Sequence, residues 1–253
     1  MSSRCKESYS IQSVENALDL LEALCDEADE FRISHLSEKL RMNKTSVFRL
    51  LATFENRGYV ERETVSGKYR LGLSAYEIGQ KFLSRMGLLR NARPVMERLV
   101  RDCNEAVYLV MRRADDILFL DMVDTSQQVK VISLVGKHYP LTTTAAGKMM
   151  LAHSPSRALH HCAPDWPDAG ELGQIGRQGF CVDHGGLGDG IVSAAVPLLN
   201  AAREICGCLC LVGPDFRMPP DKLEMIVLPA LREAGEIVSS KLGHLEHYLR
   251  SGN

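Results

Sequence analysis

The segment from residue 44 to residue 57 constrains the fold most, because its side chains separate into two opposite faces at helical spacing. One face carries apolar side chains that need a protein core, namely Val47, Leu50, Leu51 and Phe54. The opposite face carries polar or small side chains, namely Thr45, Arg49, Ala52 and Asn56. Gly58 ends this predicted helix. Such a helix packs one face on a small core and leaves the other free to contact a partner.

The flanking segments supply the rest of a small helical domain. Two amphipathic helices are predicted before this one, the first over residues 11–25 and a shorter one through Ile33, Leu36 and Leu40. A tight turn at Arg41–Asn43 joins the second helix to the third, with the small Ser37 where they cross. Arg41 stands where such turns usually have glycine, because one residue there adopts a left-handed conformation.

Two strand-like segments follow the third helix, Tyr59–Arg62 and Lys68–Leu71, with Ser66–Gly67 at the turn between them. Two helices joined by a tight turn and followed by a hairpin are typical of a winged helix-turn-helix, whose second helix of the pair enters the major groove of DNA. The alternative is a small helical domain with a solvated basic face, and the hairpin favours the winged version.

Charge around the third helix fits a DNA contact. Residues 41–70 contain seven basic and three acidic side chains, whereas the whole chain has a net charge of −2. The expected base contacts come from Thr45, Ser46 and Arg49, because arginine can bind a guanine edge through two hydrogen bonds. The expected phosphate contacts come from the start of the third helix and from the hairpin, namely Lys44, Arg62, Lys68 and Arg70.

The length of 253 residues predicts two domains of unequal size. We expect the winged helix-turn-helix over 1–72, a linker helix that pairs two subunits over 73–90, and an effector-binding domain over 91–253. Apolar residues of the linker helix would form the dimer contact: Leu73, Tyr76, Phe82, Leu83, Met86 and Leu89. The sequence contains no apolar run long enough to span a membrane and no signal peptide, so we expect a cytoplasmic protein.

The third region alternates strand-like and helical patterns, which predicts an antiparallel sheet flanked by helices and hence an α+β protein. The expected strands are Val107–Met111, Ile117–Val123, Val129–Val135, Ile191–Leu199 and Ile205–Val212. A long helix is expected from about Pro220 to Leu249, and a helix beginning at Thr144 or Ala145.

Several motifs in the same order resemble the IclR family of transcriptional regulators over nearly the whole chain. They are residues 14–22, residues 36–40 and 43–61, the hairpin end Gly67–Gly72, residues 140–148, residues 177–183 and Cys210–Pro214. The resemblance implies a winged helix-turn-helix, a linker helix and a GAF-like effector domain. It also implies a dimer or a dimer of dimers on palindromic double-stranded DNA, with binding set by a small metabolite.

The resemblance also places an effector pocket. Small residues at the start of a helix, Ala145, Ala146 and Gly147, would let a carboxylate approach backbone N–H groups and the helix dipole. Asp183 would accept a hydrogen bond from a ligand hydroxyl or hold a donor in place, and Tyr139, Ile191, Cys210 and Val212 would form an apolar wall. This predicts a small organic acid as the effector. Without the resemblance, close helix packing would be the better explanation of the small residues.

Three other functions fit parts of the sequence less well. Cys206, Cys208 and Cys210 alternate along a strand and could bind zinc, although the spacing is unusual and no metal is expected. An enzyme would need a pair such as Cys181 and His184, which no motif surrounds. A protein-binding adaptor would present a more apolar third helix. We therefore expect a regulator that is not an enzyme and has no cofactor.

Overall fold

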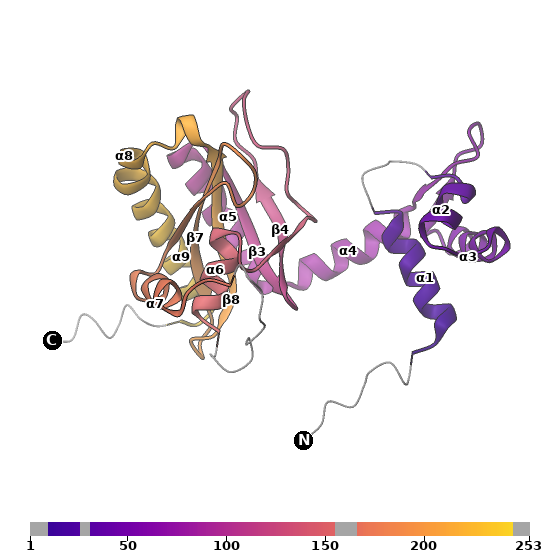
Figure 1. Ribbon diagram of the computed structural model, residues 1–253, viewed down its shortest axis with the longest axis horizontal. Coiled ribbons are helices and arrows are strands. Elements are labelled where there is room, and N and C mark those ends of the chain that lie inside the picture. The colour runs from indigo at the N-terminus through magenta and orange to yellow at the C-terminus, as the bar shows by residue number, and fades with distance from the viewer. Residues whose placement is uncertain (1–9, 26–30, 155–165, 245–253) are drawn as a thin grey trace, which may run out of the picture. The chain divides into compact units, whose positions relative to one another are not determined.

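The structure is a computed structural model, and it describes residues 10–25, 31–154 and 166–244. Contacts within the chain divide it into two units, with the boundary in the sequence between Arg85 and Met86. Figure 1 shows the N-terminal unit in indigo to purple and the C-terminal unit in magenta to yellow. Each unit has its own apolar core and is described by itself.

The N-terminal unit is the predicted winged helix-turn-helix. Its elements are α1 (Gln12–Ala23), α2 (Ile33–Lys39), α3 (Lys44–Asn56), β1 (Val60–Arg62), β2 (Tyr69–Leu71) and α4 (Leu73–Arg85). The core takes the apolar faces that the sequence predicted, including Leu20, Leu36, Val47, Leu51 and Tyr69. The sequence did not predict a β-bridge that joins Phe31 to the hairpin. Phe31 and Tyr69 exchange backbone hydrogen bonds of 2.8 and 2.7 Å.

The turn between α2 and α3 has the predicted left-handed residue, since Arg41 has a φ of 52°. Ser37 holds this turn from both of its polar groups. Its hydroxyl donates to the carbonyl oxygen of Met42 at 2.6 Å, and its own carbonyl oxygen accepts the Met42 N–H at 3.1 Å. A larger side chain without a hydroxyl would lose the first bond and crowd the crossing of the two helices.

Replacing Arg41 by glycine is expected to stabilise the N-terminal unit by roughly 0.5–1 kcal/mol, because glycine reaches positive φ without the Cβ clash that arginine has. Native-state hydrogen exchange at the amides of α2 and α3 measures the gain. Arg41→Ala is the matched control: it keeps the Cβ and should give no stabilisation. An equal gain in both variants would show that backbone strain is not the cause.

The linker helix is shorter than predicted. The expected single helix over 73–90 is two helices, because α4 ends at Arg85 and α5 (Gly87–Cys103) begins two residues later. Met86 lies between them with an extended ψ of 102°. The break follows a change of environment: α4 buries no residue, whereas α5 buries a stripe on the sheet of the C-terminal unit, formed by Leu88, Ala92, Val95, Met96, Leu99 and Cys103.

The C-terminal unit contains the predicted antiparallel sheet, six strands in the order β5-β4-β3-β8-β7-β6. The strands are β3 (Ala106–Arg113), β4 (Asp116–Val123), β5 (His138–Pro140), β6 (Cys181–His184), β7 (Ile191–Leu199) and β8 (Ile205–Pro214). The strand expected over Val129–Val135 is wrong. That segment forms no strand, and its burial does not alternate, since Val129 and Ile132 are exposed while Leu134 is buried. The edge strand beside β4 is β5 instead.

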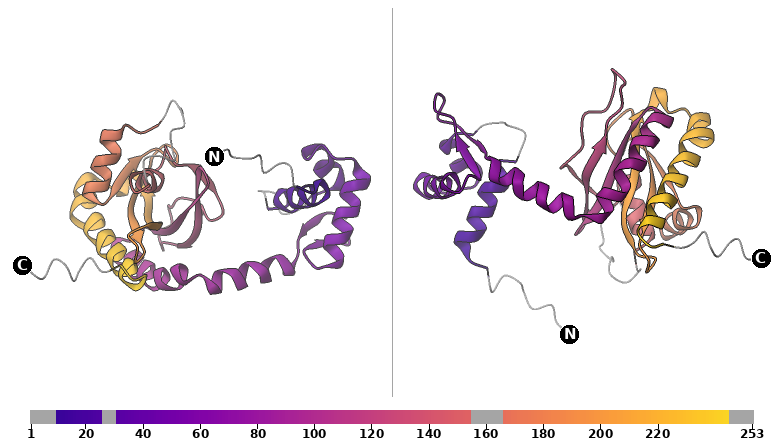
Figure 2. Two further views of the ribbon diagram at one scale, coloured as in Figure 1. Left: turned by 90° about the horizontal axis from the view of Figure 1, so that it is seen from below. Right: turned by 180° about the vertical axis from the view of Figure 1, so that it is seen from behind.

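Helices cover both faces of this sheet. On one face lie α5 and α9 (Leu228–Lys241), which cross the sheet in the right-hand view of Figure 2. On the other face lie α6 (Ala145–Ala152) and α7 (Ala169–Gln178). A second apolar core is packed between α6 and the strands. The start of α6 agrees with the sequence prediction.

The last helix begins at Pro220, as predicted, but it is interrupted. A short α8 (Pro220–Lys222) leads into a π-helical turn, η3 (Leu223–Val227), before α9. Pro229 lacks the N–H that would bond four residues back, which favours an irregular turn at this point. The helix ends at Lys241, and the last residues of the predicted helix, from 245 to 249, lie outside the described part of the chain.

Candidate DNA interface and candidate ligand site

Of the three side chains predicted to contact bases, Thr45 and Arg49 are exposed at the start of α3, and Ser46 is half-buried. Asn43 caps the helix, and its side-chain oxygen accepts the Ser46 N–H at 2.8 Å. Val47 and Leu51 point into the core, which turns Thr45 and Arg49 toward solvent. The amphipathic pattern of the sequence therefore determines which side chains this helix can offer to another molecule.

The basic side chains expected to meet phosphate fall into two groups. Lys44 and Arg62 are exposed, and the guanidinium of Arg62 stacks 5.7 Å from the ring centroid of Tyr69 on the hairpin. Arg70 is exposed too, but it forms an ion pair with Glu61 at 3.0 Å, so that its charge is partly offset. Lys68 is half-buried. Lys44 and Arg62 are thus better placed for a phosphate than Arg70.

The linker helix α4 presents apolar side chains without any burial in its own unit. Leu73, Tyr76, Ile78 and Phe82 are all exposed there. Leu89, which the sequence assigned to the same surface, packs instead against the core beneath α5. Exposed apolar side chains of this number are typical of a helix that pairs with another chain.

The predicted ligand residues lie in the layer between α6 and the sheet. Ala145, Ala146, Cys210 and Val212 belong to one buried cluster, and Tyr139 and Ile191 pack against it. Strand pairing aligns Asp183 with Ser193, and Ser193 with Val212, so that these three side chains lie in one row on the same face of the sheet. The structure thus brings the predicted residues to one face, and most of them are buried there.

The start of α6 differs in detail from the expectation. The hydroxyl of Thr144 accepts the Gly147 N–H at 3.1 Å, which leaves Ala145 and Ala146 as the residues whose N–H groups could meet a ligand. A Cβ on Gly147 would lie 2.3 Å from the carbonyl oxygen of Leu141. Close packing against that backbone therefore explains this glycine by itself.

Two buried hydroxyls in the same layer were missed by the sequence interpretation. The Ser193 hydroxyl lies in a side chain that is 1% exposed, and no hydrogen-bond partner for it lies among residues 10–25, 31–154 and 166–244. It faces the α6 side, in the row with Asp183 and Val212. The one signal for it was a serine inside the otherwise apolar run of β7.

The second hydroxyl is that of Tyr108 on β3, aligned with Cys210. It lies beside the backbone of Leu134 but makes no well-formed hydrogen bond to a described residue. Burial raises the pKa of Tyr108 to about 12, although the Leu134 backbone opposes the shift. The hydroxyl therefore stays protonated near neutral pH and can donate a hydrogen bond. Buried polar groups normally have partners, so both hydroxyls indicate a place where a polar ligand could bind.

Asp183 is already engaged within the protein. Its carboxylate accepts the Gly186 N–H at 2.8 Å, and a Cβ on Gly186 would lie 2.3 Å from the same oxygen. Lys148 lies on the same side and bonds to Glu171 on α7 at 2.9 Å, a contact that raises the pKa of Lys148. The aspartate thus anchors the loop after β6 as well as facing the buried layer.

The three alternating cysteines do not share a face. Leu198 pairs with Gly207 and Leu199 with Ile205, so Cys206 is the extra residue of a bulge. As a result Cys208 and Cys210 face the α6 side, whereas Cys206 packs against the opposite core. No group of three potential metal ligands occurs among the described residues. These three cysteines therefore do not come together to form a zinc site.

The cysteine and histidine considered for an enzyme are also separated. Cys181 faces the α6 side, where burial raises its pKa to about 12, and His184, three residues further along the strand, is exposed. A thiol with a raised pKa is a poor nucleophile. The pair does not form a catalytic dyad.

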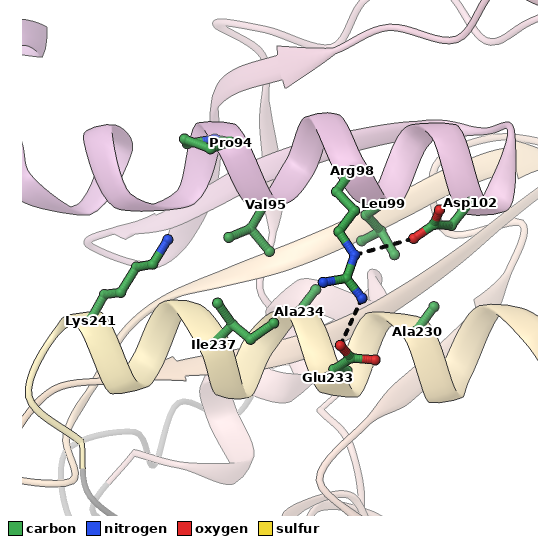
Figure 3. A pocket seen from close by; sticks show the side chains of 10 residues that line it. All are labelled: Pro94, Val95, Arg98, Leu99, Asp102, Ala230, Glu233, Ala234, Ile237 and Lys241. Atoms are coloured by element: carbon green, nitrogen blue, oxygen red, sulfur yellow. Dashed lines mark hydrogen bonds and ion pairs between the residues drawn. The ribbon is translucent and has the colours of Figure 1, made fainter.

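Two cavities lie on the opposite face of the sheet from the predicted ligand residues. One, of about 210 Å³, lies between α5 and α9 and is shown in Figure 3. Arg98 crosses it to Glu233 at 2.8 Å and lies 3.6 Å from Asp102. The charge of Arg98 is neutralised by these two carboxylates. Arg98 is therefore not free to bind an anion in this cavity. The other, of about 560 Å³, lies beside β6 and is lined by Phe180, His184 and Leu228 among others.

Comparison with known proteins matches both units to models of one family. A family described as the IclR helix-turn-helix domain matches residues 13–64, and one described as the bacterial transcriptional regulator IclR C-terminal matches residues 80–166. The chain is 28% identical to the HTH-type transcriptional regulator KdgR of Escherichia coli, over 96% of this chain and 97% of that protein.

Solved structures share the fold. The crystal structure of a transcriptional regulator from Alicyclobacillus acidocaldarius has a TM-score of 0.79 at 24% identity, covering 93% of this chain and 100% of that one. A homologue from Microbacterium hydrocarbonoxydans, complexed with 4-hydroxybenzoate, has a TM-score of 0.76 at 22% identity, covering 91% and 98%. In the part of this chain that the structure describes, no helix is long and apolar enough to cross a membrane.

Proposed function

The chain belongs to the IclR family of transcriptional regulators and binds DNA, and from this premise we propose that its DNA binding is controlled by a small organic acid held between α6 and the sheet. It is a regulator and not an enzyme. The domains proposed for these roles are the winged helix-turn-helix over 1–72, the linker helix α4 over 73–85 and the effector domain over 86–253.

Two copies of the chain form the DNA-binding species in this proposal. Exposed apolar side chains of α4, among them Leu73, Tyr76 and Phe82, are covered by the same helix of a second copy. A symmetric pair of winged helices then meets a palindromic operator, with one α3 in each half-site. Thr45, Ser46 and Arg49 contact the bases, while Lys44, Arg62, Lys68 and Arg70 contact the phosphates.

The observation that carries the effector proposal is the unpartnered, buried hydroxyl of Ser193. A ligand that accepts its hydrogen bond, and whose carboxylate meets the start of α6, would satisfy a group that otherwise costs about 1–3 kcal/mol. The Tyr108 hydroxyl and the Ala145 and Ala146 N–H groups are further donors to such an anion. The homologue with bound 4-hydroxybenzoate gives a precedent for a carboxylate in this fold.

The layer is closed in this structure, since Thr144, Ala145 and Cys210 are buried. Entry of a ligand therefore requires the covering segments to move. A ligand changes DNA affinity only if it binds two arrangements of the protein unequally. The movement that admits the ligand supplies the second arrangement.

A screen of small carboxylates by thermal shift on the full-length protein tests the proposal. Aromatic acids and keto acids form the two arms. A ligand at a hundred times its Kd stabilises the folded state by about 2.7 kcal/mol, which shifts the melting temperature measurably. The stabilising acid should then change the affinity for a selected DNA duplex in fluorescence anisotropy. The proposal fails if acids that stabilise the protein leave DNA affinity unchanged, or if none of them stabilises it.

Replacing Ser193 by alanine is expected to affect stability and ligand binding in opposite directions. The unliganded protein should gain about 1 kcal/mol, because a buried hydroxyl without a partner is removed. Affinity for the stabilising acid should fall about tenfold, the value of one hydrogen bond to a charged group. Urea unfolding and isothermal titration calorimetry measure the two effects. Ser239→Ala is the control, because that serine is also buried but its hydroxyl accepts the Leu199 N–H at 3.0 Å. It should lose stability and keep the ligand affinity.

A further inference from the structure

Phe48 is an aromatic side chain that the fold of the N-terminal unit does not use. It is 50% exposed, and it is absent from the core that holds Val47 and Leu51 on the same helix. Leu50 and Phe54 pack against that core, whereas Phe48 does not. Phe48 also lies outside the polar strip that the sequence assigned to base contacts.

The position of Phe48 on α3 makes it a neighbour of that strip. Thr45 lies three residues before it and Ala52 four residues after it, so all three share one side of the helix. Arg49 follows directly and is exposed on the adjoining side. The capped start of the helix at Asn43 and the exposed Lys44 border the ring on a polar and basic surface.

A phenyl ring neither donates nor accepts a conventional hydrogen bond, so it can distinguish bases only through an apolar contact. The major groove offers one apolar group among the four bases, the C5 methyl of thymine. A ring that contacts another protein would instead be expected among other apolar side chains. The basic and polar neighbours of Phe48 therefore favour DNA as its partner.

We propose that Phe48 packs on the C5 methyl of one thymine in each half-site and makes that position specific for thymine. This inference rests on the DNA-binding role of α3. Burial of one methyl group predicts about a fourfold preference at one half-site and about fifteenfold when both half-sites contribute.

Replacing thymine by deoxyuridine tests the contact directly, because uracil lacks only the methyl group and keeps every hydrogen-bonding edge. The preferred duplex is first selected from random sequences with the full-length protein. Each thymine is then replaced singly, and afterwards in symmetric pairs, and Kd is measured by fluorescence anisotropy at fixed salt. One symmetric pair should weaken binding of the unmodified protein about fifteenfold.

Phe48→Ala should remove this penalty, so that the variant binds the thymine and uracil duplexes alike, and Phe48→Leu should retain part of it. Phe216→Ala, which truncates an exposed phenylalanine of the C-terminal unit, should retain all of it. The inference is overturned if no uracil substitution weakens the unmodified protein, or if Phe48→Ala keeps the penalty or changes only the oligomeric state. Failure of the unmodified protein to select any duplex would overturn the role of α3 as well.

Discussion

Replacing Arg49 by alanine is expected to weaken operator binding by about 5- to 150-fold, corresponding to roughly 1–3 kcal/mol. The guanidinium is exposed near the start of α3, where it can reach two acceptors on a guanine edge. Losing the guanidinium should also relax specificity at one base pair per half-site, because alanine makes no hydrogen bond that distinguishes guanine from the other bases. Anisotropy measurements with the selected duplex, and with duplexes changed at each guanine, test both effects.

Two control variants separate base contact from charge. Lys68→Ala, on the hairpin, should weaken all sequences alike and flatten the dependence of Kd on salt, as expected for a phosphate contact. Arg57→Ala removes an exposed arginine just after the end of α3, away from its start, and should leave specificity unchanged. If Arg49→Ala binds as tightly and as specifically as the unmodified protein, α3 does not read the operator through this residue.

The N-terminal unit could be predicted closely because its determinants are local. The period of Val47, Leu50, Leu51 and Phe54 settles which face of α3 is buried. The left-handed φ of Arg41 follows from the geometry of the turn, whatever residue occupies it. The antiparallel sheet with helices on both faces could also be predicted, since four of the five expected strands form two hairpins, β3–β4 and β7–β8, whose paired strands are neighbours in sequence.

The errors arise where distant contacts override a local pattern. Residues 87–90 continue the helical pattern of α4, yet Leu88 packs on a sheet whose strands come later in the chain, and the helix breaks at Met86. Val129–Val135 is rich in β-branched residues, but no neighbouring strand pairs with it. The cysteine alternation fails at Cys206 because one bulged residue reverses the face of the strand.

The candidate ligand site was the least predictable part. Ser193 is one polar residue in an apolar strand, and only strand register aligns it with Asp183 and Val212. Thr144 was expected only as a possible helix start, and its bond to the Gly147 N–H depends on side-chain geometry that sequence spacing does not provide. Residue types were therefore predictable here, whereas the identity of the hydrogen-bond donors was not.

A buried ion pair holds the C-terminal unit together at the beginning of its sheet. Glu105, 1% exposed, accepts two hydrogen bonds from the guanidinium of Arg217, at 2.7 and 2.8 Å. A third nitrogen of Arg217 donates to the carbonyl oxygen of Val129 at 2.6 Å. A Cβ on Gly213 would lie 2.8 Å from the carboxylate, so β8 needs a glycine at this position. The Arg217 side chain thus joins η2 (Asp215–Arg217) to the residue before β3 and to the segment between β4 and β5.

Replacing Arg217 by alanine is expected to destabilise the C-terminal unit by about 3 kcal/mol, because it leaves the Glu105 carboxylate buried without its main partner. The loss stays near the lower end of the usual range, since Lys222 remains 3.7 Å from the same carboxylate. Lys222→Ala should therefore cost much less. The double variant Glu105→Leu/Arg217→Met should recover most of the stability, because an apolar pair of similar volume avoids the desolvation of a lone charge. Urea unfolding followed by the fluorescence of Trp166 measures all three. A double variant no more stable than Arg217→Ala would show that packing by the arginine, rather than the buried charge, stabilises this junction.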